Sequence, residues 1–372
     1  MDPRNEKLAA GLIHHSCRLE KNEKILIECT GIEAIPLVDC IVREVYRSGG
    51  LPYVNIYSET TQRELLMGTR QERYASLTGR DKAFMEQMDA FIGVGAPENT
   101  NENNDVPQEN MNLHEKLYRK PVHSDTRVKK TKWVILRYPT AGFAQHFGSS
   151  REAFADFYYN VCNLDYGKML RAMQPLKALM ERTDMVRITG PGTDLSFSIK
   201  AVPVIPCAGE LNIPDGEIFT APVKDSVNGT LRFNTGSDFQ GFHYTDVALE
   251  FRDGKIVNAA ANDTERINKV FDTDAGARYA GEFAIGVNPY ITKPMNSTLF
   301  DEKIMGSFHF TPGSCYEEAS NGNDSAIHWD LVCIQTPEWG GGEMWFDGVL
   351  VRKDGLFVPE ELRALNPENL LA

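Results

Sequence analysis

Residues 24–57 read KILIECTGIEAIPLVDCIVREVYRSGGLPYVNIY, and this stretch decides the fold class of the first half of the chain. The runs at 24–29 and 52–57 are short and apolar, as expected for strands, and residues 32–48 between them have helical spacing that ends at Gly49-Gly50. Further strands are expected at 89–94 and 132–137, and further helices at 5–21 and 59–80. Strands that alternate with helices predict an α/β domain with a mostly parallel sheet covered on both faces.

The second half of the chain is mainly strands and turns. Gly190-Pro191-Gly192 separates strands expected at 185–189 and 194–199, and Asp-Gly turns divide the alternating runs at 249–257 and 349–358. A helix is expected at 263–271, with Asp263 as its cap. These patterns predict an α+β domain with a largely antiparallel, barrel-like sheet.

Two segments link these patterns into a domain organisation. Residues 98–113 are polar and rich in Asn, which predicts a surface loop, and residues 151–183 have a helical pattern with an expected break at Pro175. The helical stretch leads into the strand-rich half. We therefore expect an α/β domain over residues 1–184 and a metal-binding catalytic α+β domain over 185–372.

The composition limits the classes of partner and the compartment. The chain has 372 residues, 42% of them hydrophobic, and a net charge of −13, which argues against nucleic acid as a partner. It contains no apolar run near the roughly 20 residues that span a bilayer, and no apolar signal core follows the charged start Met-Asp-Pro-Arg. The seven cysteines are scattered without a Cys-x-x-Cys pair, as is usual for reduced thiols. We expect a cytoplasmic protein that does not enter a membrane.

His328 and Asp330 are the most informative pair for function. They stand two residues apart in a run from Ile327 that has the apolar character of a buried strand. Residues two apart in a strand project to the same face, so an imidazole and a carboxylate are expected side by side while Trp329 points the other way. Such a pair is half of a metal site, although a structural hydrogen bond between the two side chains would have the same spacing.

Further carboxylates and an imidazole occur elsewhere in the second half. Glu217, Glu282, Glu302 and His309 join the pair as possible ligands. Carboxylate and imidazole donors suit zinc, cobalt, manganese or iron(II) without any thiolate, and their number is sufficient for two ions. Taken singly, each glutamate is also compatible with a solvated charge and each histidine with a core position.

At these residues the chain resembles a known family, the metal-dependent aminopeptidases of the aminopeptidase T and aminopeptidase S group (leucyl aminopeptidase-like). The blocks that carry the resemblance follow the family order and cover most of residues 185–335: Gly192-Thr-Asp-Leu195, Asn212-x-Pro-x-x-Glu217-Ile-Phe-Thr-Ala-Pro222, Gly281-Glu282, Leu299-Phe-Asp-Glu302, His309 with Tyr316, and Ser325-x-x-His328-x-Asp330.

The resemblance implies a co-catalytic pair of divalent ions and a homodimer. Its pattern makes Glu217, Glu282, His309, His328 and Asp330 ligands, Glu302 a ligand or proton carrier, and Tyr316 a hydrogen-bond donor to the oxyanion. The chain also departs from the family. The step from Glu302 to His309 is about two residues longer than in better-known members, Gly216 replaces a second acid that many members carry, and the N-terminal region is shorter.

The resulting hypothesis is a metallo-aminopeptidase that hydrolyses the N-terminal residue of peptides with a water activated by two metal ions, which could be zinc, cobalt, manganese or magnesium. Glu217 or Glu302 would carry the proton to the leaving amine. One alternative is a ring-cleaving dioxygenase of the dihydroxypyridine type, with a single iron(II) held by His309, His328 and Asp330. Another is a metal-stabilised protein that binds peptides without turnover.

Overall fold

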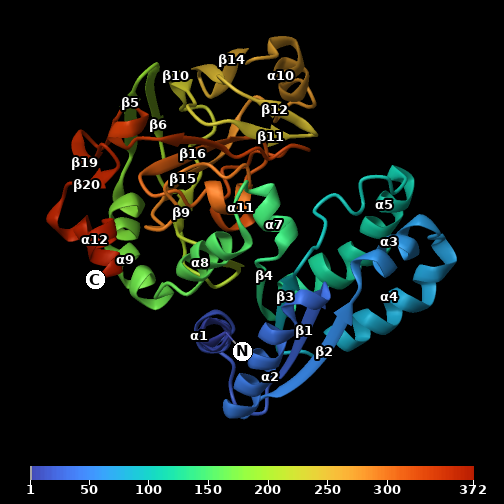
Figure 1. The fold of residues 1–372 in the computed structure, drawn as a ribbon. Helices are drawn as coiled ribbons and strands as arrows, with labels where there is room; N and C mark the ends of the chain where they lie inside the picture. Colours follow the sequence, from blue (N-terminus) through green and yellow to red (C-terminus); the bar gives the residue numbers. More distant parts are fainter. Residues whose placement is uncertain (1) are drawn as a thin grey trace. The chain divides into compact units, whose positions relative to one another are not determined.

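Figure 1 shows the chain in a computed structural model that describes residues 2–372. The chain forms two compact units: unit 1 comprises Met1–Leu164 and Gly209–Pro214, and unit 2 comprises Asp165–Ala208 and Asp215–Ala372. Helix α9 (Tyr166–Arg182) thus belongs to unit 2, whereas the sequence suggested a domain that starts at residue 185. The division at residue 184 stays a prediction.

Unit 1 is built on a five-stranded parallel sheet in the order β2-β1-β3-β4-β8. Ile25, Leu26 and Ile27 of its strand β1 are all buried, as expected for a strand covered on both faces. The predicted parallel sheet is therefore confirmed. Its strands are β1 (Lys24–Thr30), β2 (Leu51–Tyr57), β3 (Ala90–Gly95), β4 (Lys132–Arg137) and β8 (Asn212–Ile213).

The helices of unit 1 differ from the sequence prediction in three places. The helix expected at 5–21 ends at Ser16. The helix expected at 59–80 is divided at Gly68, and the second part of the loop expected at 98–113 is helical and continues to residue 130. Val122 in this helix packs against Leu26 and Phe91, so burial against the sheet stabilises a segment whose polar sequence gave no helical signal. The helices are α1 (Pro3–Gly11), η1 (Leu12–Ser16), η2 (Ile32–Ala34), α2 (Ile35–Arg47), α3 (Glu59–Met67), α4 (Gln71–Met85), α5 (Gln108–His114), η3 (Glu115–Arg127), α6 (Val128–Lys130), α7 (Ala141–His146) and α8 (Arg151–Cys162).

Unit 2 opens with helix α9, which runs unbroken through Pro175. The break expected at this proline was wrong; the chain instead interrupts the helical stretch at residues 163–165, between α8 and α9. Pro175 removes one backbone hydrogen bond, but Met169, Met173 and Leu176 are fully buried on the helix and their packing outweighs that loss.

The remainder of unit 2 contains an eight-stranded sheet, a five-stranded sheet and a two-stranded hairpin, all antiparallel. The predicted antiparallel character is confirmed, and the turns at Asp253-Gly254 and Asp354-Gly355 have the positive φ angles of tight hairpins. Phe197 of the larger sheet contacts Phe283 and Phe310 of the smaller one, with ring centroids 5.0 and 5.2 Å apart. The core of unit 2 therefore includes the interface between these sheets.

The larger sheet has the order β14-β13-β10-β6-β5-β18-β19-β20 and the smaller one β17-β16-β15-β9-β7. The strands are β5 (Met185–Gly190), β6 (Thr193–Ser198), β7 (Ile205–Cys207), β9 (Glu217–Thr220), β10 (Asn228–Arg232), β11 (Ser237–Phe239), β12 (Phe242–Tyr244), β13 (Ala248–Arg252), β14 (Lys255–Ala260), β15 (Ala280–Gly286), β16 (Ser307–Pro312), β17 (Leu331–Ile334), β18 (Glu343–Phe346), β19 (Val349–Lys353) and β20 (Leu356–Phe357).

Short helices lie between these strands and after the last of them. Helix α10 occupies the region expected to be helical, and its cap Asp263 accepts a hydrogen bond from the backbone N–H of Arg266. The short helices are α10 (Thr264–Phe271), α11 (Thr298–Asp301), η4 (Glu317–Ala319), η5 (Pro337–Trp339), η6 (Glu360–Leu365) and α12 (Pro367–Leu371).

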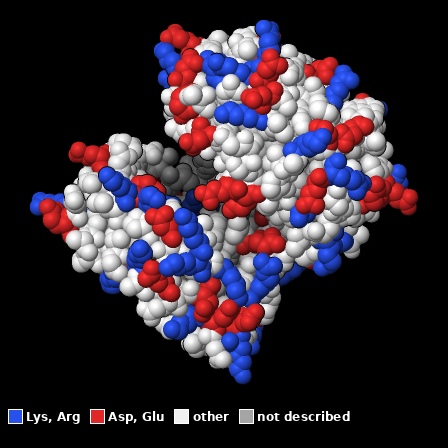
Figure 2. Space-filling model, turned by 180° about the vertical axis from the view of Figure 1, so that it is seen from behind, with Lys and Arg blue, Asp and Glu red and all other residues white. Residues whose placement is uncertain are grey.

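The surface carries charges of both signs. Acidic and basic side chains are interspersed on the face seen in Figure 2, although acids outnumber bases in the sequence. Over residues 2–372, each helix is too short or too polar to cross a bilayer.

Candidate metal centre

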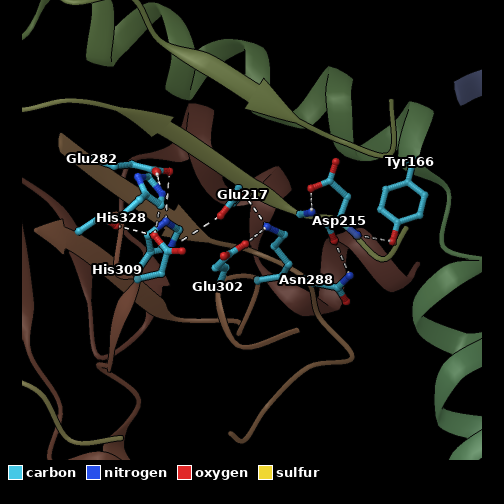
Figure 3. Close-up of polar contacts among 12 residues, drawn as sticks. Tyr166, Asp215, Glu217, Glu282, Asn288, Glu302, His309 and His328 are labelled. Carbon is cyan, nitrogen blue, oxygen red and sulfur yellow. Dashed lines mark hydrogen bonds and ion pairs between the residues drawn. The ribbon is translucent and has the colours of Figure 1, made fainter. Parts of the chain in front are cut away.

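Three adjacent strands of the five-stranded sheet bring Glu217, Glu282 and His309 together. Glu217 begins β9, Glu282 lies in β15 and His309 in β16, and each side chain is less than a tenth exposed. His309 stands between the two acids: its Nε2 is 3.2 Å from Glu282 Oε1 and its Nδ1 is 3.7 Å from Glu217 Oε2 (Figure 3). The strand order thus produces a cluster whose members are far apart in the sequence.

His328 and Asp330 join the cluster from the segment that precedes β17. His328 Nε2 lies 3.3 Å from Glu282 Oε2 and 3.2 Å from Asp330 Oδ1, so the two side chains meet as their spacing predicted. Trp329 turns the other way and stacks on Phe239, with ring centroids 4.6 Å apart.

The strand assignment for this pair was wrong, because β17 begins only at Leu331. His328 forms an isolated bridge with Gly313, whose φ of 113° takes the opposing chain out of regular strand geometry. The extended backbone nevertheless keeps the alternation of side chains on which the prediction depended.

Two neighbours fix the orientation of the pair. His328 Nδ1 donates to the carbonyl oxygen of Ser314 at 2.8 Å, and Thr311 Oγ1 donates to Asp330 Oδ1 at 2.7 Å. A hydrogen bond at Nδ1 leaves Nε2 of a neutral imidazole as the free acceptor, which is the form that binds a metal ion. Sequence reasoning did not identify either neighbour.

The donors form two groups that share one carboxylate. Glu217, Glu282 and His309 make one group, and Glu282, His328 and Asp330 make the other; within each, the ligand atoms lie within 4.8 Å of one another. Because one oxygen of Glu282 faces His309 and the other faces His328, Glu282 has the position of a bridging ligand.

Several buried atoms of the cluster make no hydrogen bond in the structure. They are Glu217 Oε2, His309 Nδ1 and His328 Nε2, each with almost no contact with solvent. A buried polar atom without a hydrogen bond destabilises the fold. The same atoms carry electron pairs that can coordinate a cation. The residues therefore fit a divalent metal ion in both position and chemistry.

The electrostatics of the cluster point in the same direction. Burial opposes ionisation of Glu282 and Asp330, but the adjacent imidazoles of His309 and His328 hold the pKa of both carboxyls below their ordinary values. Burial also opposes a charge on the histidines, yet the adjacent carboxylates raise the pKa of His309 to about 9 and of His328 to about 11. The ionised carboxylates attract cations, and metal binding would release the imidazole protons.

Glu302 lies beside the two donor groups and is held by a lysine. Lys303 Nζ contacts Glu302 Oε2 and lies 2.6 Å from Glu217 Oε1. Burial raises the pKa of Glu302 well above its usual range, which favours the protonated form of this carboxyl. Lys303 was missed by the sequence analysis, although its position directly after Glu302 was a signal of a charge partner.

Tyr316 covers the cluster from the segment after β16. Its ring lies against His328 and Phe219, with centroids 4.8 and 5.5 Å away. Desolvation and the negative charges of Glu282 and Asp330 raise the pKa of Tyr316 far above its ordinary value. The phenol therefore stays protonated and can donate a hydrogen bond.

Comparison with known proteins identifies the family. Residues 1–343 match the sequence profile of the thermophilic metalloprotease family (M29). The chain belongs to this family.

Relatives of this M29 chain are named as aminopeptidases. The chain is 24% identical to aminopeptidase PepS of Streptococcus thermophilus over 95% of each chain. It is 26% identical to aminopeptidase T of Thermus thermophilus over 95% of this chain and 96% of the other. A 33% identity to aminopeptidase 2 of Geobacillus stearothermophilus covers 39% of this chain and 37% of that protein. The structure of wild-type AmpT from Thermus thermophilus has the same fold, with a TM-score of 0.78, 22% identity and coverage of 96% and 99%.

Membership in M29 makes the chain a metallopeptidase, a hydrolase that uses a divalent metal, and the donor groups around Glu282 suit that requirement. The fold and the relatives support the peptidase hypothesis and give no support to the ring-cleaving dioxygenase.

Proposed function

We propose that this M29 metallopeptidase removes the amino-terminal residue of peptides and uses two divalent ions held by Glu217, Glu282, His309, His328 and Asp330. The observation that carries the proposal is the pair of donor groups that share Glu282. The aminopeptidase names of the relatives support the choice of substrate end. Zinc, cobalt, manganese and magnesium all suit a donor set of carboxylates and imidazoles.

The chain's own groups have distinct roles in this reaction. When bound, a pair of divalent ions lowers the pKa of a shared water and polarises the scissile carbonyl. Ser314 and Thr311 hold His328 and Asp330 in their ligating orientation. Glu302, which belongs to neither donor group, takes the proton of the attacking water and delivers it to the leaving amine; Glu217 is the other carboxylate placed to do so. The Tyr316 hydroxyl donates to the oxyanion.

The first experiment measures divalent metals per chain by elemental analysis on protein purified without chelator. It is combined with a leucyl-anilide assay after addition of cobalt, zinc or manganese. We expect about two ions per chain and hydrolysis that depends on them. One iron per chain with oxygen uptake on a dihydroxypyridine would favour the dioxygenase. Metal binding with no hydrolysis of any aminoacyl anilide would favour the peptide-binding protein.

Replacement of a ligand tests the residue assignment. His328→Ala and Asp330→Ala should each lose bound metal and hydrolysis together, because each removes a donor from the group that includes Glu282. His14→Ala is the matched control, since His14 is an exposed histidine of unit 1 that pairs with Glu44 at 2.7 Å. Full activity in both ligand variants would contradict the assignment.

We also propose that the protein is a cytoplasmic homodimer. Within residues 2–372 the seven cysteines form no disulfide and five of them are buried, which suits a reducing compartment. Light scattering coupled to gel filtration tests the dimer, and a mass near 41.7 kDa, that of one chain, would contradict it.

A further inference from the structure

Lys303 is a buried cation inside the candidate metal centre, and the proposed reaction assigns it no role. Its side chain is 2% exposed, its Nζ lies 2.6 Å from Glu217 Oε1, and it also contacts Glu302 Oε2. The negative charge of Asp215 acts on it as well. A buried lysine is rare unless it is paired, so this position requires a specific explanation.

The backbone around Lys303 is fixed in place. Its carbonyl oxygen accepts a hydrogen bond from the backbone N–H of Asn288 at 2.9 Å, and Asn288 Nδ2 donates to the carbonyl oxygen of Asp215 at 2.7 Å (Figure 3). A Cβ atom at Gly286 would lie 2.4 Å from the carbonyl oxygen of Ile304, so the end of β15 and the turn after Lys303 are in close contact. Lys303 is therefore held by the segment that follows β15, which is itself tied to the segment that precedes β9.

The two carboxylate oxygens of Glu217 face different partners because of Lys303. Oε1 is occupied by the ammonium, while Oε2 points towards His309 and has no hydrogen bond. Only Oε2 is thus available to an ion at the position formed by Glu217, Glu282 and His309. The ammonium also places a positive charge beside that position, where it repels a divalent cation.

The other position lacks this feature. In the group of Glu282, His328 and Asp330, the carbonyl of Ser314 orients His328 and the hydroxyl of Thr311 orients Asp330, and both of these partners are uncharged. We propose that Lys303 is a built-in cation that orients Glu217 and weakens ion binding at the Glu217–Glu282–His309 position, so that the two divalent ions bind with unequal affinity. The inference rests on the proposed two-ion site. It makes Lys303 a positioning residue that determines which of the two bound ions dissociates more readily.

Calorimetric titration of metal-free protein with cobalt alone tests the inference. We expect two binding constants in the wild type, and in Lys303→Met the weaker constant should tighten by about tenfold or more while the stronger one is unchanged. Lys303→Arg keeps the charge and should keep the wild-type constants. Lys353→Met is the control for loss of a lysine, because Lys353 pairs with Glu343 on the surface at 3.2 Å.

Loss of Lys303 removes the cation that two buried carboxyl groups share and could prevent folding. A comparison of Glu302→Gln with Glu302→Gln/Lys303→Met avoids this problem, since one of the two carboxylates is then neutral. Tightening of the weaker constant in the double variant supports the inference. Equal constants in the wild type, or a weaker constant that loss of Lys303 leaves unchanged, would overturn it. The titration contains no peptide, so its result does not depend on hydrolysis. Two unequal binding constants in a protein that hydrolyses no aminoacyl anilide would contradict the proposed function and not this inference.

Discussion

Single residues in the cluster take their roles from their neighbours. The carbonyl of Ser314 accepts a hydrogen bond from Nδ1 of His328 and so leaves Nε2 to face the cluster. Lys303 pairs with one oxygen of Glu217 and leaves the other free to face an ion. In both cases a hydrogen bond or ion pair outside the donor groups decides which atom faces the ion. Such partners are nearly as important as the ligands themselves.

Tyr316 supplies a prediction at this scale. Tyr316→Phe keeps the ring against His328 and Phe219 but removes the hydroxyl that donates to the oxyanion. We expect kcat to fall about 10²- to 10³-fold, as for other oxyanion donors, with metal content unchanged. Steady-state kinetics with a leucyl anilide, together with elemental analysis, measures both quantities. An unchanged kcat would remove Tyr316 from the mechanism.

The sequence allowed prediction of some of these residues and not of others. The two-residue spacing of His328 and Asp330 places both side chains on one side of any extended chain, so it was informative even though β17 starts later. The second partner of Lys303, Glu217, lies 86 residues earlier in the chain, and only the tertiary fold brings the two together. Local patterns contain no information on such a contact.

At the scale of elements, the cluster depends on a close approach between β15 and the segment after β16. Pairing of β15 with β16 is irregular between Ala280 and Glu282, and a Cβ atom at Gly281 would lie 2.2 Å from the carbonyl oxygen of Ser314. That carbonyl also accepts the hydrogen bond from His328. The absence of a side chain at Gly281 therefore affects the positions of two proposed ligands, Glu282 and His328.

Gly281→Ala should displace Ser314 and weaken metal binding by about 10- to 100-fold, as expected for loss of an orienting partner. The added methyl should also lower the free energy of unfolding by about 1–3 kcal/mol. Metal titration and chemical denaturation measure these effects. Gly79→Ala, in a helix with open space around it, should instead stabilise the protein by about 0.5–1 kcal/mol. Metal affinity equal to that of the wild type in Gly281→Ala would contradict the argument.

Elements with strong local signals were predicted well. The strands of unit 1 carry short apolar runs, and the Asp-Gly hairpins of unit 2 carry apolar alternation and turn residues in the sequence itself. The helix η3 is polar, and its few buried side chains contact strands that lie elsewhere in the sequence. Tertiary packing stabilises that helix, so its own residues could not predict it.

At the scale of whole units, the free energy of unfolding of unit 1 should fall at acidic pH because of two partly buried histidines. Burial and nearby arginines lower the pKa of His114 and His123 to about 4, below the ordinary value of 6.5. The unfolded chain therefore binds more protons between these values, so the stabilisation is complete above about pH 6.5 and is lost as the pH falls towards 4. The loss is at most about 3 kcal/mol per histidine.

Denaturation of metal-saturated protein at several pH values, followed by circular dichroism, measures this dependence. His123→Phe keeps an aromatic ring near Phe91 and Tyr118 and removes one titrating group. The variant should lose less free energy of unfolding than the wild type as the pH falls from about 6.5 to 4. Identical pH profiles for the two proteins would show that His123 does not contribute.

Removal of metal should affect the two units differently. All proposed ligands belong to unit 2, between Glu217 and Asp330, so bound ions stabilise that unit by mass action. After chelation, we expect faster amide hydrogen exchange in peptides that contain β9, β15 and β16 and little change in peptides that contain β1 and β3. His328→Ala should exchange quickly in the same peptides with or without chelator, because it already lacks a ligand. Equal acceleration in both units would mean that the metal stabilises the chain through contacts beyond this cluster.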